Sequence, residues 1–201
     1  MLKNKFINLC KTFCTNSELI NSLWIDIETR YSHPSRHYHT LEHLEFIYKE
    51  LSGFKLSNSL EFAIFFHDII YSVKSGKNEE NSAIYAQKLL SKLSVSKNII
   101  NEVSNIIIDT KHHIPRNNTS NLLLDADLAH LAKDYIDYKK DSAKIRKEYS
   151  IFDDETFYSG RVKILKIFLL KDKIYTLPYF YNKYEVKARE NILKEINTYC
   201  I

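Results

Sequence analysis

The sequence predicts an all-α protein, and three observations predict it. Only 3 of the 201 residues are glycine and 3 are proline, which is too few for sheets joined by tight hairpins. Apolar residues recur three and four positions apart along most of the chain, as they do on one face of a helix. Neither G-x-G-x-x-G nor G-x-x-x-x-G-K-[ST] occurs, so a Rossmann or P-loop fold is excluded.

The first three helices are expected from apolar spacing and from their breaks. Residues 6–13 carry one apolar face, and a second helix opens at Ser17 with a buried stripe that ends near residue 27. Pro34 disfavours helix at the residue before it. The third helix therefore begins between Tyr38 and Thr40 and runs to about residue 51.

The next helices follow in the middle of the chain. Ser57 or Ser59 caps a helix whose run 62–66 is apolar on every face, and such a helix belongs in the centre of a fold. A polar loop follows residue 71, and the segment 78–91 opens with acidic residues that favour a helix N-terminus. Another helix spans about residues 95–111.

Four helices complete the prediction. A short helix over about residues 122–131 follows the polar stretch around Pro115. Three more are expected at 135–149, 154–170 and 184–199, with Leu177-Pro178 separating the last two. There is no repeat or long linker, so we expect one domain over residues 1–201 with its core at about 20–195.

Composition excludes several classes of protein. The net charge of +4 is spread along the chain, without the concentrated basic face of a nucleic-acid binder. Cys10, Cys14 and Cys200 are an odd number, which indicates reduced thiols in a cytoplasmic protein. The N-terminus lacks the apolar core of a signal peptide, and the apolar run 62–71 is too short to span a bilayer.

Histidine and aspartate side chains recur on successive predicted helices. If His39 and His43 are both helical, they lie on one face, one turn apart. His67 and Asp68 close the apolar run, and they differ by about 100° around a helix, so both reach one ion only if it lies between their faces. An aspartate buried there needs a partner or a ligand.

A second aspartate pair follows later in the chain. Asp125 and Asp127 differ by about 200° around a helix, so at most one of them faces an ion well. Three imidazoles with carboxylates form a ligand set for a divalent metal that activates water.

These residues resemble the HD superfamily of metal-dependent phosphohydrolases, and more closely its bacterial branch of predicted HD-domain proteins. The similarity covers about residues 20–195, and the segments that carry it are RHYHTLEH (36–43), FHDIIY (66–71), NEENSA (78–83), LDADL (124–128), IRKEY (145–149) and residues 185–191. The resemblance implies an HD-domain-like helical bundle with the metal site at its centre.

The resemblance also implies roles for single residues. It makes His43, His67, Asp68 and Asp127 the metal ligands, because the last ligand of the superfamily precedes a leucine, as Asp127 does. Asp125 is then interpreted as a helix-start residue.

His39 is the candidate general acid. The segment Tyr38-His39-x-x-x-His43 resembles that of cyclic-nucleotide phosphodiesterases, in which the first histidine is the acid and the second binds metal. The alternative is that His39 is simply an exposed residue, or that it hydrogen-bonds to a metal ligand without contacting the metal or the substrate.

Four further residues are candidates for substrate binding. Arg36 and Lys111 could hold a phosphate, and His112 could bind substrate or a second metal. Each has a simpler alternative, since Arg36 could be a solvated loop residue and cations such as Lys111 stabilise a helix C-terminus. Glu80 is either a site residue or an acid that stabilises a helix N-terminus.

The sequence therefore predicts hydrolysis of a phosphate mono- or diester, with a nucleotide as the expected substrate. One divalent ion is expected, either Mn, Fe, Zn, Co, Ni or Mg, and a second is left open. Asp68 would orient the attacking water and accept its proton. The alternative is a catalytically silent HD-fold module that senses a nucleotide. The many tyrosines and phenylalanines would permit a homodimer.

Overall fold

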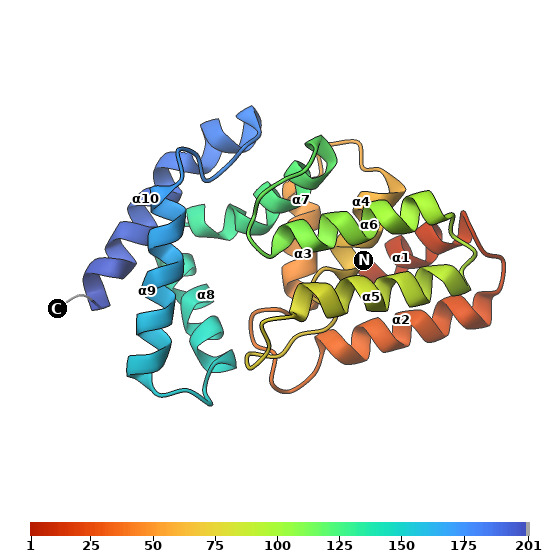
Figure 1. The fold of residues 1–201 in the computed structure, drawn as a ribbon, viewed down its shortest axis with the longest axis horizontal. Coiled ribbons are helices and arrows are strands. Elements are labelled where there is room, and N and C mark those ends of the chain that lie inside the picture. The colour runs from red at the N-terminus through yellow and green to blue at the C-terminus, as the bar shows by residue number, and fades with distance from the viewer. Residues whose placement is uncertain (200–201) are drawn as a thin grey trace. The chain divides into compact units, whose positions relative to one another are not determined.

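The computed structural model describes residues 1–199, and this part of the chain contains ten α-helices, one 3-10 helix and no strand (Figure 1). The all-α prediction is therefore confirmed. The chain forms two compact units, Met1–Leu124 and Asp125–Ile201. The single-domain expectation stays a prediction.

The first unit contains six helices and most of a seventh. They are α1 (Leu2–Lys11), α2 (Ser17–Tyr31), α3 (Leu41–Glu50), α4 (Asn58–Phe66), α5 (Asn78–Lys92), α6 (Lys97–Thr110) and α7 (Asn118–Leu128), which extends into the second unit. Side-chain caps fix the starts of α2 and α4. The Asn16 side chain accepts a hydrogen bond from the main-chain N–H of Leu19, and Ser57 accepts one from that of Leu60, as expected for N-cap residues.

Helix α4 forms the centre of the first unit, as its all-round apolar sequence predicts. It packs against α1, α3, α5 and α6, and every residue from Phe62 to Phe66 is fully buried. Phe6 of α1 meets the ring of Phe65 edge-on, with the ring centroids 5.1 Å apart. A helix surrounded in this way fixes the position of whatever follows its C-terminus.

The second unit contains the 3-10 helix Ala129–Ala132 and α8 (Tyr135–Glu148), α9 (Asp154–Leu170) and α10 (Pro178–Tyr199). Helix α10 packs against the 3-10 helix and α9. It begins at Pro178, earlier than predicted. Proline suits the first position of a helix, because the N–H that it lacks would have no partner there.

Two buried carboxylates organise the second unit. Glu185 accepts hydrogen bonds from the main-chain N–H groups of Ile174 and Tyr175 at 3.0–3.1 Å. Glu195 is 6% exposed and pairs with Arg161, whose Nε lies 2.9 Å from its Oε1. Tyr138 also donates a hydrogen bond to Glu195. Both carboxylates therefore hold segments of the unit together.

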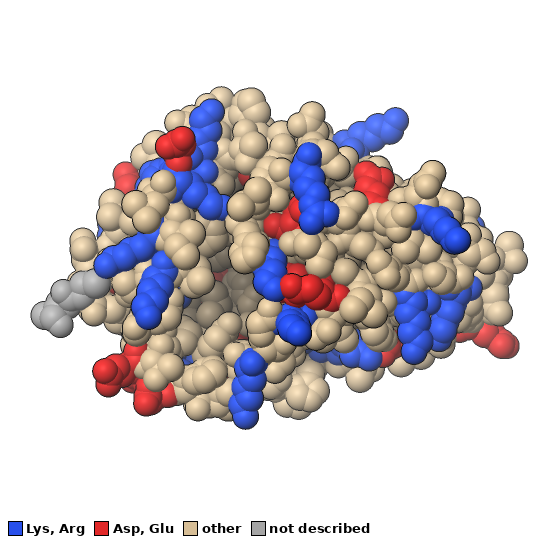
Figure 2. Space-filling model, in the orientation of Figure 1, with Lys and Arg blue, Asp and Glu red and all other residues tan. Residues whose placement is uncertain are grey.

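The described surface carries charges of both signs. Figure 2 shows lysine and arginine side chains spread over the face in view, with acidic side chains between them. No helix among the described residues is long and apolar enough to cross a membrane. Cys10 and Cys14 are free thiols, and burial raises the pKa of Cys10 to about 12, with a smaller contribution from Cys14. Cys200 lies outside the described residues.

Candidate metal centre

Three of the expected ligands converge in the first unit. His43 lies in α3, His67 immediately follows α4, and Asp68 is the next residue. His67 Nε2 lies 3.4 Å from His43 Nε2 and 3.1 Å from Asp68 Oδ2, and His43 Nε2 lies 3.9 Å from the same oxygen. The two imidazoles are 5% and 1% exposed, and Asp68 is half-buried.

These separations suit a metal ion. Bonds of about 2.0–2.2 Å to nitrogen and oxygen place the ligand atoms of a tetrahedral ion about 3.4 Å apart. The three observed distances, 3.1, 3.4 and 3.9 Å, surround this value. The group could therefore hold an ion with little movement of its side chains.

The tautomer of His67 adds a second argument. Its Nδ1 lies 3.0 Å from the main-chain carbonyl oxygen of Ile64, which can only accept a hydrogen bond, so Nδ1 carries the proton. In the neutral imidazole, Nε2 then presents a lone pair toward Asp68. Two acceptors at 3.1 Å repel each other unless a proton or a cation lies between them. In metal sites, a histidine ligand usually donates its other ring N–H to a carbonyl or carboxylate oxygen, which fixes the orientation of the ring.

Asp68 is a carboxylate in this environment. Its burial would raise its pKa, but positive charge on the protonated imidazoles of His67, His39 and His43, together with a hydrogen bond from His67, outweighs that effect and holds the pKa of Asp68 well below its usual range. An ionised carboxylate among imidazoles is a binding site for positive charge.

The backbone explains why two adjacent residues reach one point. The N–H of His67 still donates to the carbonyl oxygen of Ala63, whereas the chain turns at Asp68, where the N–H of Ile69 bonds to Phe66. The helical separation of about 100° expected for neighbours does not apply beyond the end of α4. Asp68 can therefore direct its carboxylate back toward His67.

His39 lies beside the cluster but outside α3, which begins at Leu41. Its Nε2 is 4.0 Å from Asp68 Oδ2, and its ring packs on that of Tyr71 with the centroids 4.3 Å apart. The His39 side chain is 20% exposed, so it can reach a substrate that approaches from solvent.

Arg36 is buried and bonded to the backbone. Its guanidinium group donates hydrogen bonds to the carbonyl oxygens of His39 at 3.1 Å, Asp68 at 2.7 Å and Ile69 at 3.0 Å. The group also lies over the ring of Tyr31. Arg36 thus ties the segment before α3 to the turn after α4. The solvated-loop alternative is wrong, because the residue is only 8% exposed.

The structure brings two of the expected substrate residues together. Lys111, at the end of α6, pairs with the carboxylate of Glu80 in α5 and donates to the carbonyl oxygen of Gly76 at 2.8 Å. This hydrogen bond from Lys111 is the main reason that the pKa of Glu80 is lowered. His112, the next residue, is exposed.

Asp125 and Asp127 belong to the second unit. Asp125 lies in the last third of α7 rather than at a helix start, and its two carboxylate oxygens accept the main-chain N–H groups of Thr176 and Leu177 at 2.9 and 2.7 Å. Asp127 is half-buried near the end of the same helix. Its role as the fourth ligand stays a prediction.

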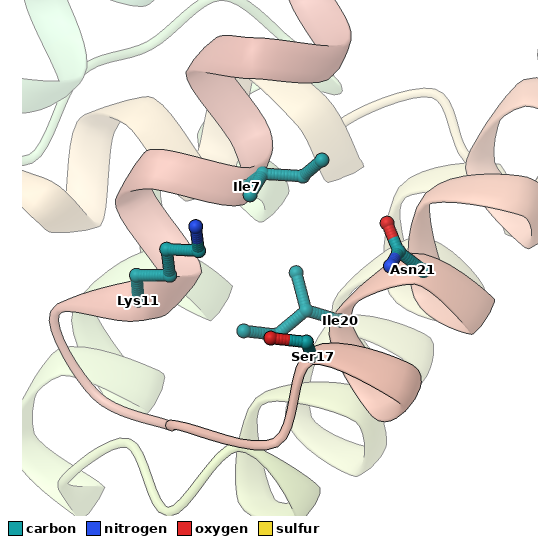
Figure 3. Close-up of a pocket in the computed structure, with 5 residues that line it drawn as sticks. All are labelled: Ile7, Lys11, Ser17, Ile20 and Asn21. Atoms are coloured by element: carbon teal, nitrogen blue, oxygen red, sulfur yellow. The ribbon is translucent and has the colours of Figure 1, made fainter.

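Sequence reasoning missed two supports of the cluster and one pocket. The Ile64 carbonyl and the Tyr71 ring carry no sequence signal, although Tyr71 stands in the FHDIIY segment. A pocket of about 180 Å³ lies between α1 and α2, lined by Ile7, Lys11, Ser17, Ile20 and Asn21 (Figure 3). It contains no residue of the cluster.

Comparisons of the chain with protein-family models, with curated proteins and with solved structures found no match.

Proposed function

We propose that this protein is a metal-dependent phosphohydrolase of the HD type, which hydrolyses a phosphate mono- or diester and takes a nucleotide as its substrate. The observation that carries the proposal is the convergence of His43 Nε2, His67 Nε2 and Asp68 Oδ2. The orientation of His67 by the Ile64 carbonyl supports it.

The residues present fit one divalent ion. Two imidazoles and a carboxylate favour Mn, Fe, Co, Ni or Zn over Mg, which prefers oxygen ligands. Asp127 is kept as the fourth ligand on the resemblance to the superfamily alone, and a second ion near His112 stays open. An ion bound here would supply Lewis-acid activation of water and neutralise negative charge on the phosphoryl group.

Asp68 and His39 would carry the proton transfers. A carboxylate oxygen of Asp68 would accept a hydrogen bond from the attacking water, orient it and take up its proton. His39 lies 4.0 Å from this carboxylate and has an exposed edge. Since an imidazole can give up a proton near neutral pH, His39 would protonate the leaving oxygen.

Lys111 would bind the phosphoryl charge, and Arg36 would act differently from the sequence-based expectation. Lys111 is half-buried, and its ammonium group lies beside the carboxylate of Glu80 and the carbonyl oxygen of Gly76. The guanidinium of Arg36 is engaged by three carbonyl oxygens, so we assign it to positioning the loop that carries His39 and Asp68.

The test combines metal content with phosphate release. Protein purified without chelator or affinity metal is analysed for bound metal, and nucleotides and phosphate esters are then assayed with that ion. His67→Ala and Asp68→Ala should lose both the ion and turnover. His33→Ala is the matched control, because His33 is exposed and its ring bonds to the neighbouring Ser35.

The outcomes separate the proposal from its alternative. Metal lost in both variants together with phosphate release by the wild-type protein supports the hydrolase. Metal and nucleotide binding without any release of phosphate indicates a sensor. A protein that takes up neither Mn nor Fe would overturn both.

A further inference from the structure

The ring of Tyr71 packs against the imidazole of His39, the candidate general acid. The ring centroids are 4.3 Å apart and the planes are inclined by 31°, so the two rings form a tilted stack. Tyr38 meets the same imidazole edge-on, with the centroids 4.9 Å apart and the planes at 84°. Two aromatic rings therefore contact the imidazole of His39, one at its face and one in the edge-to-face geometry that aromatic pairs favour.

The backbone around His39 does not by itself set the direction of the ring. His39 precedes α3, which begins at Leu41, so the regular geometry of that helix does not apply to it. Arg36 donates a hydrogen bond to the His39 carbonyl oxygen at 3.1 Å, but a bond to the main chain leaves the side-chain rotamers open. His39 Nε2 is 4.0 Å from Asp68 Oδ2, which is beyond hydrogen-bond distance. The aromatic contacts therefore restrict the rotation of the ring.

Tyr71 belongs to the turn that carries Asp68, and two side chains hold this turn. Ser82 of α5 is fully buried. Its hydroxyl accepts a hydrogen bond from the N–H of Ile70 at 3.1 Å and donates one to the carbonyl oxygen of Ile70 at 3.2 Å. Arg36 holds the two preceding carbonyl oxygens. The backbone directly before Tyr71 is thus fixed relative to Asp68.

Tyr71 is better placed than Tyr38 to orient the acid. Tyr38 also packs on the ring of His43, with the centroids 5.2 Å apart, so it supports a candidate metal ligand as well. Tyr71 reaches His39 from the turn after α4, a different segment of the chain. It therefore fixes the acid relative to the carboxylate on its own turn.

We propose that Tyr71 positions the imidazole of His39 for proton transfer to the leaving oxygen. This inference rests on the proposed function, in which His39 is the general acid. A general acid must lie within about 2.6–3.2 Å of the oxygen that it protonates. With Nε2 held 4.0 Å from Asp68 Oδ2, an oxygen atom between them can lie within reach of both. Tyr71 acts through His39 and is not a catalytic residue itself.

Two substitutions of Tyr71 separate the ring from the rest of the side chain. Tyr71→Leu removes the ring, and since a misplacement of about 1 Å can cost about a hundredfold in rate, kcat on a nucleotide substrate should fall about tenfold to hundredfold. Tyr71→Phe keeps the ring, is the matched control and should retain most of kcat. Both variants should keep their metal and their melting temperature, because Arg36 and Ser82 still hold the turn.

The leaving oxygen provides a readout that a merely structural role would not move. We would compare phenyl with p-nitrophenyl esters, both of phosphate and of thymidine 5′-phosphate. The nitro group makes the leaving oxygen less basic, so its departure depends less on an acid. Tyr71→Leu should therefore lower kcat for the phenyl ester about fivefold or more beyond its effect on the p-nitrophenyl ester. A general loosening of the site would lower both rates alike.

A double-variant cycle tests whether Tyr71 acts through His39. His39→Ala removes the acid, so the addition of Tyr71→Leu to it should cost little more than His39→Ala alone. The contact is also measured without turnover, by proton NMR of the Zn-bound full chain. The ring protons of His39, identified by their absence in His39→Ala, should be shifted upfield by the Tyr71 ring. The shift should persist in Tyr71→Phe and disappear in Tyr71→Leu.

The outcomes distinguish this inference from the proposed function. A wild-type protein that hydrolyses no nucleotide and no aryl ester overturns the proposed function, and the role of Tyr71 with it. With an active wild-type protein, four results overturn the inference alone. They are an unchanged kcat in Tyr71→Leu, an equal loss in Tyr71→Phe, a loss of metal in Tyr71→Leu, and losses from the Tyr71 and His39 variants that multiply in the double variant.

Discussion

The guanidinium group of Arg36 donates a 2.7 Å hydrogen bond to the main-chain carbonyl oxygen of Asp68, a residue of the candidate metal centre. The same group bonds to the carbonyl oxygens of His39 and Ile69. One side chain therefore fixes the backbone on both sides of the cluster, and the geometry of the centre depends on a residue that is not expected to touch the metal.

Replacing Arg36 should loosen the metal centre. Arg36→Met leaves three carbonyl oxygens without this donor, and a buried group left unsatisfied costs about 1–3 kcal/mol. We expect a lower free energy of urea unfolding and weaker metal binding, with Arg36→Lys intermediate. Metal titration and urea melts measure both. A higher KM with unchanged metal affinity would instead indicate that Arg36 binds the phosphate of the substrate.

The two aspartates of α7 should respond differently to the same change. Asp125→Asn removes one of the two oxygens that accept from Thr176 and Leu177, so it should destabilise the protein by about 1–2 kcal/mol. Its metal content should stay unchanged. Asp127→Asn should lower metal content, as the superfamily resemblance predicts. Elemental analysis of bound metal and thermal melts of both variants test these assignments. Metal loss in Asp125→Asn with destabilisation of Asp127→Asn would exchange the two roles.

Lys111 should contribute to substrate affinity more than to turnover. Losing a charged hydrogen bond to phosphate costs about 1.5–3 kcal/mol, so Lys111→Met should raise KM roughly tenfold or more and change kcat little. Lys92→Met, at an exposed site in the last turn of α5, is the control. An unchanged KM would leave Lys111 as a structural partner of Glu80.

The Arg161–Glu195 pair should stabilise the second unit strongly. Both side chains are largely buried, and removing one partner of a buried pair costs about 3–5 kcal/mol because the other charge is stranded. Arg161→Met should therefore lower the melting temperature clearly. Lys140→Met breaks the exposed pair with Asp137 and should leave the melting temperature unchanged. Equal effects of the two substitutions would contradict this assignment.

The same pair predicts a loss of stability in acid. Burial would raise the pKa of Glu195, but hydrogen bonding and attraction to Arg161 outweigh it and lower the pKa. A depressed pKa stabilises the fold above the unfolded value of about 4.3, and this stability is lost as the pH falls through the folded value. Urea unfolding from pH 7 to pH 3 should show a smaller loss for Glu195→Gln than for the wild-type protein.

The helices themselves were largely predictable from the sequence. The bounds of α9, residues 154–170, agree with the prediction, because Asp153 and the acidic first turn mark its start clearly. The N-cap Ser57 was one of two expected residues. The convergence of His43, His67 and Asp68 was implied by the resemblance to the HD superfamily, whereas the residues alone indicated only that an aspartate in an apolar run needs a partner or a ligand.

What the sequence could not reveal depends on contacts between distant segments. Arg36 stands in a polar loop beside Pro34, yet its acceptors lie 32 and 33 residues away at Asp68 and Ile69. Asp125 looks like any helical aspartate until its partners 51 and 52 residues away are known. His39 has helical spacing from His43, but α3 starts only at Leu41.

The burial of α4 has a consequence for mutational screens of this protein. Two residues of the candidate centre, His67 and Asp68, directly follow α4, and the last five residues of that helix are completely buried. In a random library, substitutions from Phe62 to Phe66 would abolish activity by lowering the amount of folded protein, and they would outnumber those that alter the chemistry. A selection on activity alone would therefore mark the whole segment as essential. Scoring abundance in parallel would leave His67 and Asp68 as the positions where protein persists and activity is lost.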